Sequence, residues 1–220
     1  MLGKILKEAL QSARDTRSYA PQARAVLNVG GNTKDIPIPT WYHGWRHDLL
    51  DIDPRCRPDL LCDARNLRSQ APEIYDAVYC SHNLEHYYPH EGLEVLRGFR
   101  HVLKADGFAE IAVPDLEAVI SRVVEAHMDL DDTLYVSGAG PITPLDVIYG
   151  LAREIETSGN DFFAHKTGFT QKLLWLALEQ AEFAPIYIFK RPEAFDLRAV
   201  AFKSAPTPEQ RQLLGLPDSG

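Results

Sequence analysis

Short apolar runs alternate along the chain with segments whose apolar residues recur every three or four positions. Five of the runs have the length and composition of strands, and they span 23–32, 46–54, 59–67, 74–81 and 107–115. The segment 92–104 has the helical pattern, so a helix is predicted between the fourth and fifth strands. Strands that alternate with helices in this way are typical of a parallel α/β sheet.

The last third of the chain continues this pattern and then closes with two strands. Helical spacing predicts helices over 116–130 and 167–183, the second with Thr170 as its N-cap. The runs 185–191 and 195–203 predict a strand pair joined by a short turn. The expected fold class is therefore α/β: a Rossmann-like three-layer sandwich with a mostly parallel seven-stranded sheet that ends in an antiparallel hairpin.

Composition changes along the chain predict the domain organisation. Residues 1–22 have an apolar stripe interrupted by charges, which predicts an amphipathic helix that packs on the domain. One domain is expected over 23–203, and it contains an insertion at about 128–168 whose glycine- and proline-rich first part shows no clear strand. The polar segment 204–220 is predicted to be a flexible tail.

Charge and cysteine content narrow the classes of partner. With 23 Lys and Arg against 31 Asp and Glu, the net charge of −8 offers no broad basic surface, so a nucleic-acid partner is not expected. Cys56, Cys62 and Cys80 form no C-x-x-C pair, and reduced thiols in a cytoplasmic protein are expected. No apolar run approaches the roughly 20 residues that span a bilayer, so no membrane span is expected.

Small and acidic residues follow the first three predicted strands, where ligands of open parallel sheets bind. Gly30 and Gly31 allow the backbone to approach a ligand closely, and Asn32 tolerates a positive φ. Asp51 and Asp53 end the second strand, where a carboxylate commonly accepts hydrogen bonds from ribose hydroxyls. Together they predict a pocket for a nucleoside.

The third run adds to this pocket. It ends in Cys62, Asp63 and Ala64, which offer a carboxylate and a backbone N–H to the edge of an adenine. Each of these features on its own is common in turns and solvated strand ends. The prediction of a nucleoside pocket rests on their order along the chain.

With these motifs in place, the chain resembles the class I S-adenosylmethionine-dependent methyltransferases, in the group related to the type 11 methyltransferase domain. The resemblance covers about 25–115 and rests on "VLNVGG", "LLDIDP", "CDARNL", "YDAVYCSHNLEHY" and "HVLKADGFAEIAVPD". It implies S-adenosylmethionine as the cofactor. The cofactor-binding residues that it implies are Gly30, Gly31, Asn32, Asp51, Ile52, Asp63, Ala64, Ser81 and His82.

Two departures from the family pattern affect the first loop. Asn32 and Lys34 stand where the family has further glycines, and Pro37 and Pro39 prevent the usual helix between the first two strands. A shorter loop with three aromatic side chains is expected there, namely Trp41, Tyr42 and Trp45. This loop could cover the cofactor, form a wall of the acceptor pocket, or fill the space of the missing helix.

The stretch "SHNLEHYYPH" contains His82-x-x-Glu85-His86, a zinc metalloprotease pattern. That pattern requires a regular helix, whereas here it directly follows a strand and Pro89 stops it, so no metal site is expected. On the methyltransferase interpretation, His82 and His86 are the candidate catalytic bases and Glu85 orients them. A purely structural role for these histidines is the alternative.

The resemblance implies that 128–168 forms a substrate-recognising cap, in which His165 precedes a predicted helix; a homodimer contact is the alternative. The predicted function is methylation of an oxygen or nitrogen atom in a small-molecule or glycan-like acceptor. Two alternatives stay open, a non-catalytic cofactor-binding module and a metal-dependent hydrolase that uses His82, Glu85 and His86.

Overall fold

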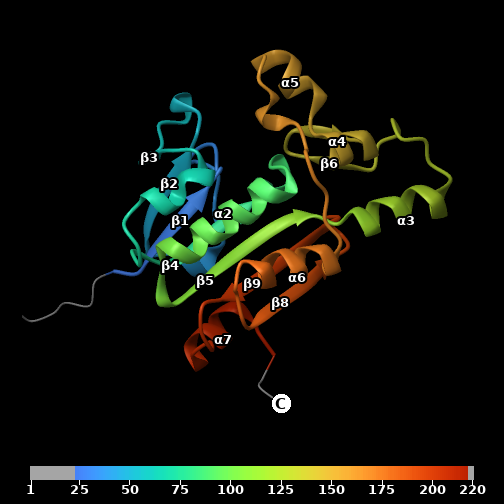
Figure 1. Cartoon of the computed structure of the whole chain (residues 1–220). Coiled ribbons are helices and arrows are strands. Elements are labelled where there is room, and N and C mark those ends of the chain that lie inside the picture. Colours follow the sequence, from blue (N-terminus) through green and yellow to red (C-terminus); the bar gives the residue numbers. More distant parts are fainter. Residues whose placement is uncertain (1–22, 218–220) are drawn as a thin grey trace, which may run out of the picture.

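A central sheet of seven strands organises the computed structural model, which describes residues 23–217 (Figure 1). The strands are β1 (Ala25–Val29), β2 (Arg46–Asp51), β3 (Leu60–Leu61), β4 (Tyr75–Ser81), β5 (Leu103–Pro114), β8 (Ile186–Arg191) and β9 (Asp196–Phe202). Their order is β3-β2-β1-β4-β5-β9-β8. The pairs among β1 to β5 are parallel, and β9 is antiparallel to both β5 and β8. The predicted fold class is thus confirmed; the helix predicted over 1–22 lies outside the described residues.

Two long helices cover one face of the sheet. They are α2 (Pro89–Val102), between β4 and β5, and α6 (Gln171–Gln180), before β8, and Figure 1 shows both in front of the strands. Most of the apolar stripe of α2 is buried, including Phe99, whose burial stabilises the fold by about 1.5–3 kcal/mol. Thr170 caps α6 as predicted, because its side chain accepts a hydrogen bond from the Leu173 N–H.

The opposite face has only a 3-10 turn where the usual helix between β1 and β2 would lie. This turn, η1 (Thr40–Tyr42), follows the two prolines as expected. Tyr42 is 3 % exposed and stacks on Phe108, while Trp41 and Trp45 pack at the edge of the same apolar cluster. Of the three roles considered for this loop, the structure therefore shows that the aromatic side chains fill the space of the missing helix.

The prediction of a flexible tail over 204–220 is wrong for its described part. Residues Pro208–Leu214 form a helix, α7, whose N-cap Thr207 accepts a hydrogen bond from Gln210. Leu214 and Leu216 are buried against the same sheet face as Tyr42. The physical reason is that this face lacks a helix from the β1–β2 connection, and α7 covers apolar surface that would otherwise contact water.

The third predicted strand, 59–67, is much shorter in the structure. Only Leu60–Leu61 pair with β2, and the chain then turns at Asp63 into a 3-10 helix, η3 (Ala64–Ser69). The Asp63 side chain accepts a hydrogen bond from the Arg65 N–H, which caps this helix and ends the strand.

The insertion forms a small layer of its own at the end of the sheet from which the helix α3 leaves (Figure 1). Its elements after α3 (Leu116–Ala126) are β6 (Tyr135–Ser137), β7 (Gly140–Ile142), α4 (Pro144–Tyr149), α5 (Ala152–Ser158) and η5 (Asp161–Phe163). The short β6–β7 hairpin corrects the expectation that this segment has no strand. Among residues 23–217, none of the helices has the length and apolar character needed to cross a bilayer.

Candidate functional site

The turn after β1 is crowded at its first two positions, both of which are glycine. Gly30 has φ of +68°, and a Cβ atom there would lie 2.1 Å from the Asn83 Nδ2 atom. A Cβ atom at Gly31 would lie 2.2 Å from the Asn28 Nδ2 atom. Asn32 follows with φ of +60°, in the left-handed region that asparagine tolerates. The turn thus leads the backbone tightly across the end of β1.

Asp51 lies next to this turn, because β2 is parallel to β1 and ends at the same edge. Its carboxylate accepts hydrogen bonds from the Asn32 N–H at 3.2 Å and the Asp53 N–H at 3.0 Å. A carboxylate has about four acceptor positions, so Asp51 keeps further ones for a ligand. Asp53, by contrast, forms an ion pair with Arg55. The Ile52 side chain between the two aspartates is 41 % exposed.

The carboxylate of Asp63 is held by a two-point ion pair with Arg65, whose shorter contact is 2.5 Å. Arg65 also pairs with Glu91 at the start of α2. Burial raises the pKa of Asp63, but the hydrogen bonds from Arg65 outweigh it and lower the pKa overall. Asp63 is therefore an oriented anion beside the buried Ala64, between η3 and the β2 edge.

His82 follows β4 with φ of +49° and lies between two carboxylates. Its Nδ1 atom is 3.5 Å from Glu85 Oε1, and its Nε2 atom is 3.7 Å from Asp196 Oδ2. Burial lowers the pKa of His82, but Asp196 and Glu85 outweigh it and raise the pKa to about 9. The imidazolium form is therefore favoured at neutral pH, which argues against His82 as a general base; its catalytic role stays a prediction.

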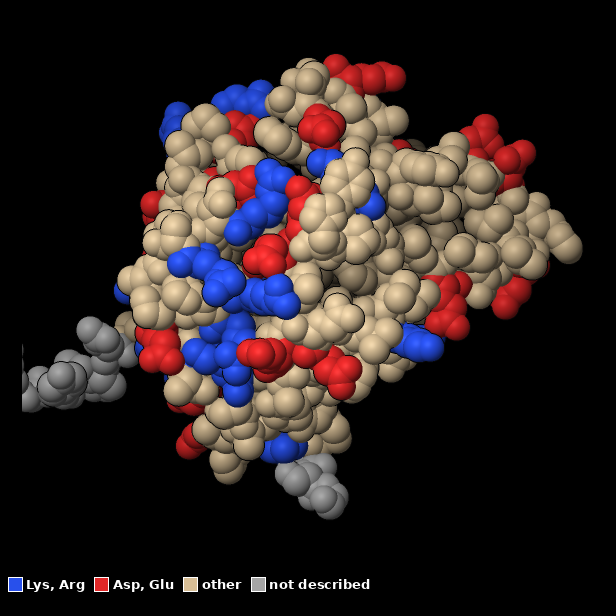
Figure 2. Space-filling view, viewed as in Figure 1, with Lys and Arg blue, Asp and Glu red and all other residues tan. Residues whose placement is uncertain are grey.

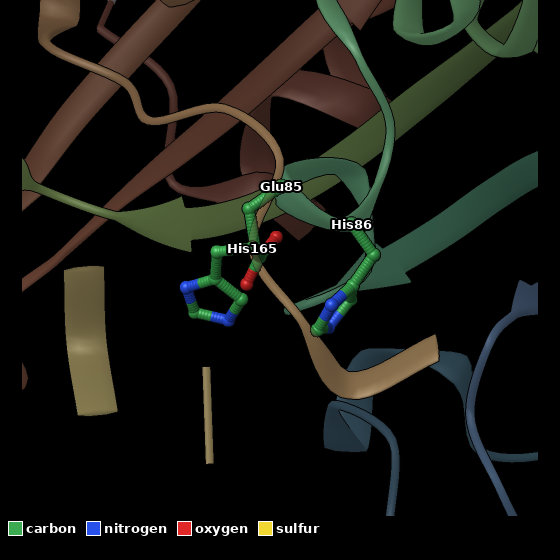
Figure 3. Close-up of side chains that lie close together, drawn as sticks. All are labelled: Glu85, His86 and His165. Carbon is green, nitrogen blue, oxygen red and sulfur yellow. The ribbon is translucent and has the colours of Figure 1, made fainter. Parts of the chain in front are cut away.

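Three side chains from two distant segments converge beside His82. Glu85 and His86 belong to the 3-10 turn η4 (Leu84–His86), and His165 lies in the segment after η5 (Figure 3). One ligand atom from each of the three lies within 4.8 Å of the others. The rings of His86 and His165 meet edge to face, with centroids 4.8 Å apart.

A cavity of about 560 Å³ lies between this group and the insertion. The histidines and Asp196 lie on its polar side, and Tyr135, Ile142 and Val147 of the insertion lie on its apolar side. Its volume is typical of small-ligand sites. A larger open groove of about 900 Å³ runs along α3, α6 and β8, away from the glycine turn, so we place the chemistry in the smaller cavity.

Sequence analysis missed how two residues join this site. The sequence places His165 ahead of a predicted helix and Asp196 in a predicted strand, and neither position indicates a site. They are separated along the chain from His82 and Glu85 by about 80 to 115 positions, and no local pattern connects such residues. The antiparallel entry of β9 next to β5 brings Asp196 to the cavity.

The segment His82-x-x-Glu85-His86 does not have the regular helix that a zinc metalloprotease motif requires. η4 is a single 3-10 turn that does not include His82, and the backbone is already extended at Tyr87. The two histidines therefore do not share one face of a regular helix, which the zinc pattern requires.

A band of Lys and Arg side chains crosses the face that carries α2, interleaved with Asp and Glu (Figure 2). Several of these charges form ion pairs, such as Arg65 with Glu91 and Arg97 with Glu94. Paired arginines attract a phosphate backbone weakly. The absence of a nucleic-acid partner stays a prediction.

No protein-family model and no curated protein matches the sequence. Solved structures do match. A SAM-dependent methyltransferase from Archaeoglobus fulgidus has 16 % identity and a TM-score of 0.50, with 90 % of this chain and 93 % of that chain covered. The PH0226 protein from Pyrococcus horikoshii OT3 has 14 % identity and a TM-score of 0.53, with 90 % of each chain covered. A SAM-dependent methyltransferase from Methanosarcina mazei has 14 % identity and a TM-score of 0.51, with 84 % and 94 % covered.

Proposed function

We propose that this chain, which has the class I methyltransferase fold, uses S-adenosylmethionine to methylate an oxygen or nitrogen atom of a small-molecule or glycan-like acceptor. The proposal rests on three features that lie close together at one edge of the sheet. The glycine turn after β1 and the carboxylate of Asp51 at the end of β2 lie beside the end of β4, and His82, directly after β4, lines the cavity.

The residues at this edge fit the cofactor. Asp51 keeps acceptor positions that suit the two ribose hydroxyls, and the exposed side chain of Ile52 offers an apolar surface to an adenine ring. The turn formed by Gly30, Gly31 and Asn32 is partly exposed, and we place the amino-acid part of the cofactor against it. Ser81 and His82 follow toward the cavity, and Asp63 with Ala64 lies on the adenine side.

When bound, the cofactor supplies an activated methyl group, and the protein has to orient the acceptor and manage its proton. The cavity has aromatic and polar walls, for Tyr135 stacks on Phe195 and Ser137 and Asp146 also line it. Such walls suit an acceptor with both a ring and hydroxyl or amino groups. The insertion then acts as the cap that selects the acceptor.

We assign the role of general base to His86 and a role in orienting the acceptor to His82; both residues line the cavity. The Nδ1 atom of His86 donates to the Ala164 carbonyl oxygen at 3.1 Å, because that carbonyl can only accept. The Nε2 atom of His86 therefore keeps its lone pair. His82, between two carboxylates, fits the role of a donor that orients the acceptor.

The alternative of a cofactor-binding module without turnover rests on Asn32 and Lys34, which replace glycines of the family pattern. It predicts retained affinity for S-adenosylhomocysteine with no methyl transfer across a wide panel of acceptors. Transfer to any acceptor excludes it.

The decisive test is a calorimetric titration of the full chain with S-adenosylhomocysteine. We expect Asp51→Ala to weaken binding by at least about tenfold, since charge-assisted hydrogen bonds contribute about 1.5–3 kcal/mol each. Asp35→Ala removes an exposed carboxylate in the loop between β1 and β2; it is the matched control and should bind as the wild type does. Absence of binding by the wild type would remove the basis of the proposal.

A further inference from the structure

We propose that Glu85, His86 and His165 bind one divalent transition-metal ion in the wall of the cavity (Figure 3). One ligand atom from each residue lies within 4.8 Å of the others. Ligand atoms that each bind a metal at about 2.1 Å lie roughly 3–4 Å apart. Small side-chain rotations therefore suffice to close the site.

The two histidines are oriented as metal ligands usually are. His86 Nδ1 donates to the Ala164 carbonyl oxygen at 3.1 Å, and His165 Nδ1 donates to the Val147 carbonyl oxygen at 2.8 Å. A carbonyl oxygen accepts only, so in both rings the proton is on Nδ1 and the Nε2 lone pair is available. Histidine ligands of metals commonly donate their other ring N–H to such a carbonyl, which fixes the tautomer and the ring orientation.

The burial of Glu85 supports the metal site independently of the histidines. Its side chain is 1 % exposed, yet neither carboxylate oxygen accepts a hydrogen bond from any described residue. A buried carboxylate without hydrogen bonds is costly, and native proteins pair such groups with a cation or coordinate a metal with them. The nearest cationic group is His82, at 3.5 Å from Oε1, which leaves Oε2 without a partner.

Backbone hydrogen bonds hold the two segments together independently of any ion. The Glu85 carbonyl oxygen accepts from the Lys166 N–H at 2.9 Å and from the Thr167 N–H at 3.2 Å. With the bond from His86 to Ala164, these contacts tie η4 to the segment on both sides of His165. The ligand set is therefore assembled by the fold, and the ion would bind to a prepared site.

The chemistry of the ligands selects the metal. Two imidazoles and one carboxylate favour borderline ions such as Zn²⁺, Co²⁺ or Fe²⁺ over Mg²⁺ and Ca²⁺, which prefer oxygen ligands. Three protein ligands leave at least one coordination position open, as catalytic sites do. Glu85, His86 and His165 all line the cavity, so this position faces the space assigned to the acceptor.

This site differs from the hydrolase pattern in which His82 and His86 are the zinc ligands. Here Glu85 is itself a ligand, and His165 of the insertion takes the place of His82. If the proposed function holds, the ion would bind an acceptor through an oxygen atom, which favours hydroxyl-bearing acceptors; this last step rests on that proposed function. His86 would then be a ligand and not a base.

The test is a titration of the full chain with Co²⁺ after chelator treatment and dialysis. We expect one Co²⁺ per chain, with visible absorption bands of a nitrogen- and oxygen-ligated ion. His165→Ala and Glu85→Gln should each weaken binding by at least about tenfold, because even outer-shell partners change metal affinity 10–100-fold. His90→Ala removes an exposed histidine near the same turn and should leave the affinity unchanged.

Thermal unfolding and S-adenosylhomocysteine binding of each variant establish that it is folded. Glu85→Gln keeps the shape of the side chain and serves if His165→Ala does not fold. Failure of the wild type to bind Co²⁺ stoichiometrically would overturn the metal site, as would equal affinities in the wild type and both variants. Retained S-adenosylhomocysteine binding in that case would leave the proposed function in place.

Discussion

Gly30 illustrates how a single position serves both the fold and the site. Its φ of +68° disfavours any residue with a side chain, and the neighbouring Asn83 amide occupies the place of a Cβ atom. Gly159 has nearly the same φ of +66° but no atom within 4 Å of a built Cβ. Substitutions at these two glycines therefore distinguish the cost of the left-handed backbone, which both positions share, from the cost of a steric clash, which only Gly30 has.

We expect Gly30→Ala to lower the free energy of unfolding by about 1–3 kcal/mol. It should also weaken S-adenosylhomocysteine binding, because the β1 turn or the Asn83 side chain must shift to admit the methyl group. Gly159→Ala carries only the cost of the left-handed backbone, about 1 kcal/mol, and should bind normally. Urea denaturation and calorimetry measure the two effects. Equal behaviour of both variants would contradict the steric argument.

At the scale of elements, α7 substitutes for a helix that the β1–β2 connection cannot form. Tyr42 fills part of the uncovered face, and its hydroxyl donates to the buried Glu110 carboxylate at 2.7 Å. Arg198 of β9 pairs with the same carboxylate at 2.6 Å. Leu214 and Leu216 then close the face from the C-terminal side.

Leu214→Ala should lower the free energy of unfolding by about 2–4 kcal/mol, because it removes a side chain that is 4 % exposed within this cluster. Gln212→Ala, on the exposed side of the same helix, should change stability by less than about 0.5 kcal/mol. Chemical denaturation provides the comparison. A negligible effect of Leu214→Ala would mean that α7 does not pack on the sheet, in agreement with a flexible tail.

For the molecule as a whole, carboxylates at the sheet end link stability to pH. Asp196 is 3 % exposed. Burial raises its pKa, but the nearby His82 ring and the hydrogen bonds from Arg191 outweigh it, so its folded pKa is lower than its unfolded pKa. Such a group stabilises the fold above its unfolded pKa of about 3.9, and the contribution is lost as the pH falls through the folded pKa.

We expect Arg191→Gln to lower the free energy of unfolding by about 1–3 kcal/mol at neutral pH, because Arg191 makes two hydrogen bonds of 2.6 Å to Asp196. Below about pH 4 the difference from the wild type should shrink, since the unfolded chain then takes up a proton at Asp196 before the folded wild type does, and this offsets the stabilisation by Arg191. Arg55→Gln, whose own side chain is 66 % exposed in its pair with Asp53, should show little change at any pH. Denaturant titrations across this pH range test the expectation.

The order of elements and the sheet edge at which the glycine turn meets Asp51 were predictable from sequence because their signals are local. A strand or helix is specified by neighbouring residues at a period of two or 3.6, and parallel strands place their ends at one edge. Asp51 and the glycine turn followed from this rule alone. The loss of the helix after β1 was predictable too, because Pro37 and Pro39 act on their own backbone.

The sequence by itself therefore determined the α/β sandwich and the positions of the glycine turn and Asp51. Only the tertiary structure decided that Glu85, His86 and His165 converge, that Asp196 faces His82, and that the C-terminal segment packs as α7. These groupings depend on how an insertion folds back and on how β9 enters the sheet. Contacts between residues so far apart arise from packing of the whole chain, which no local periodicity encodes.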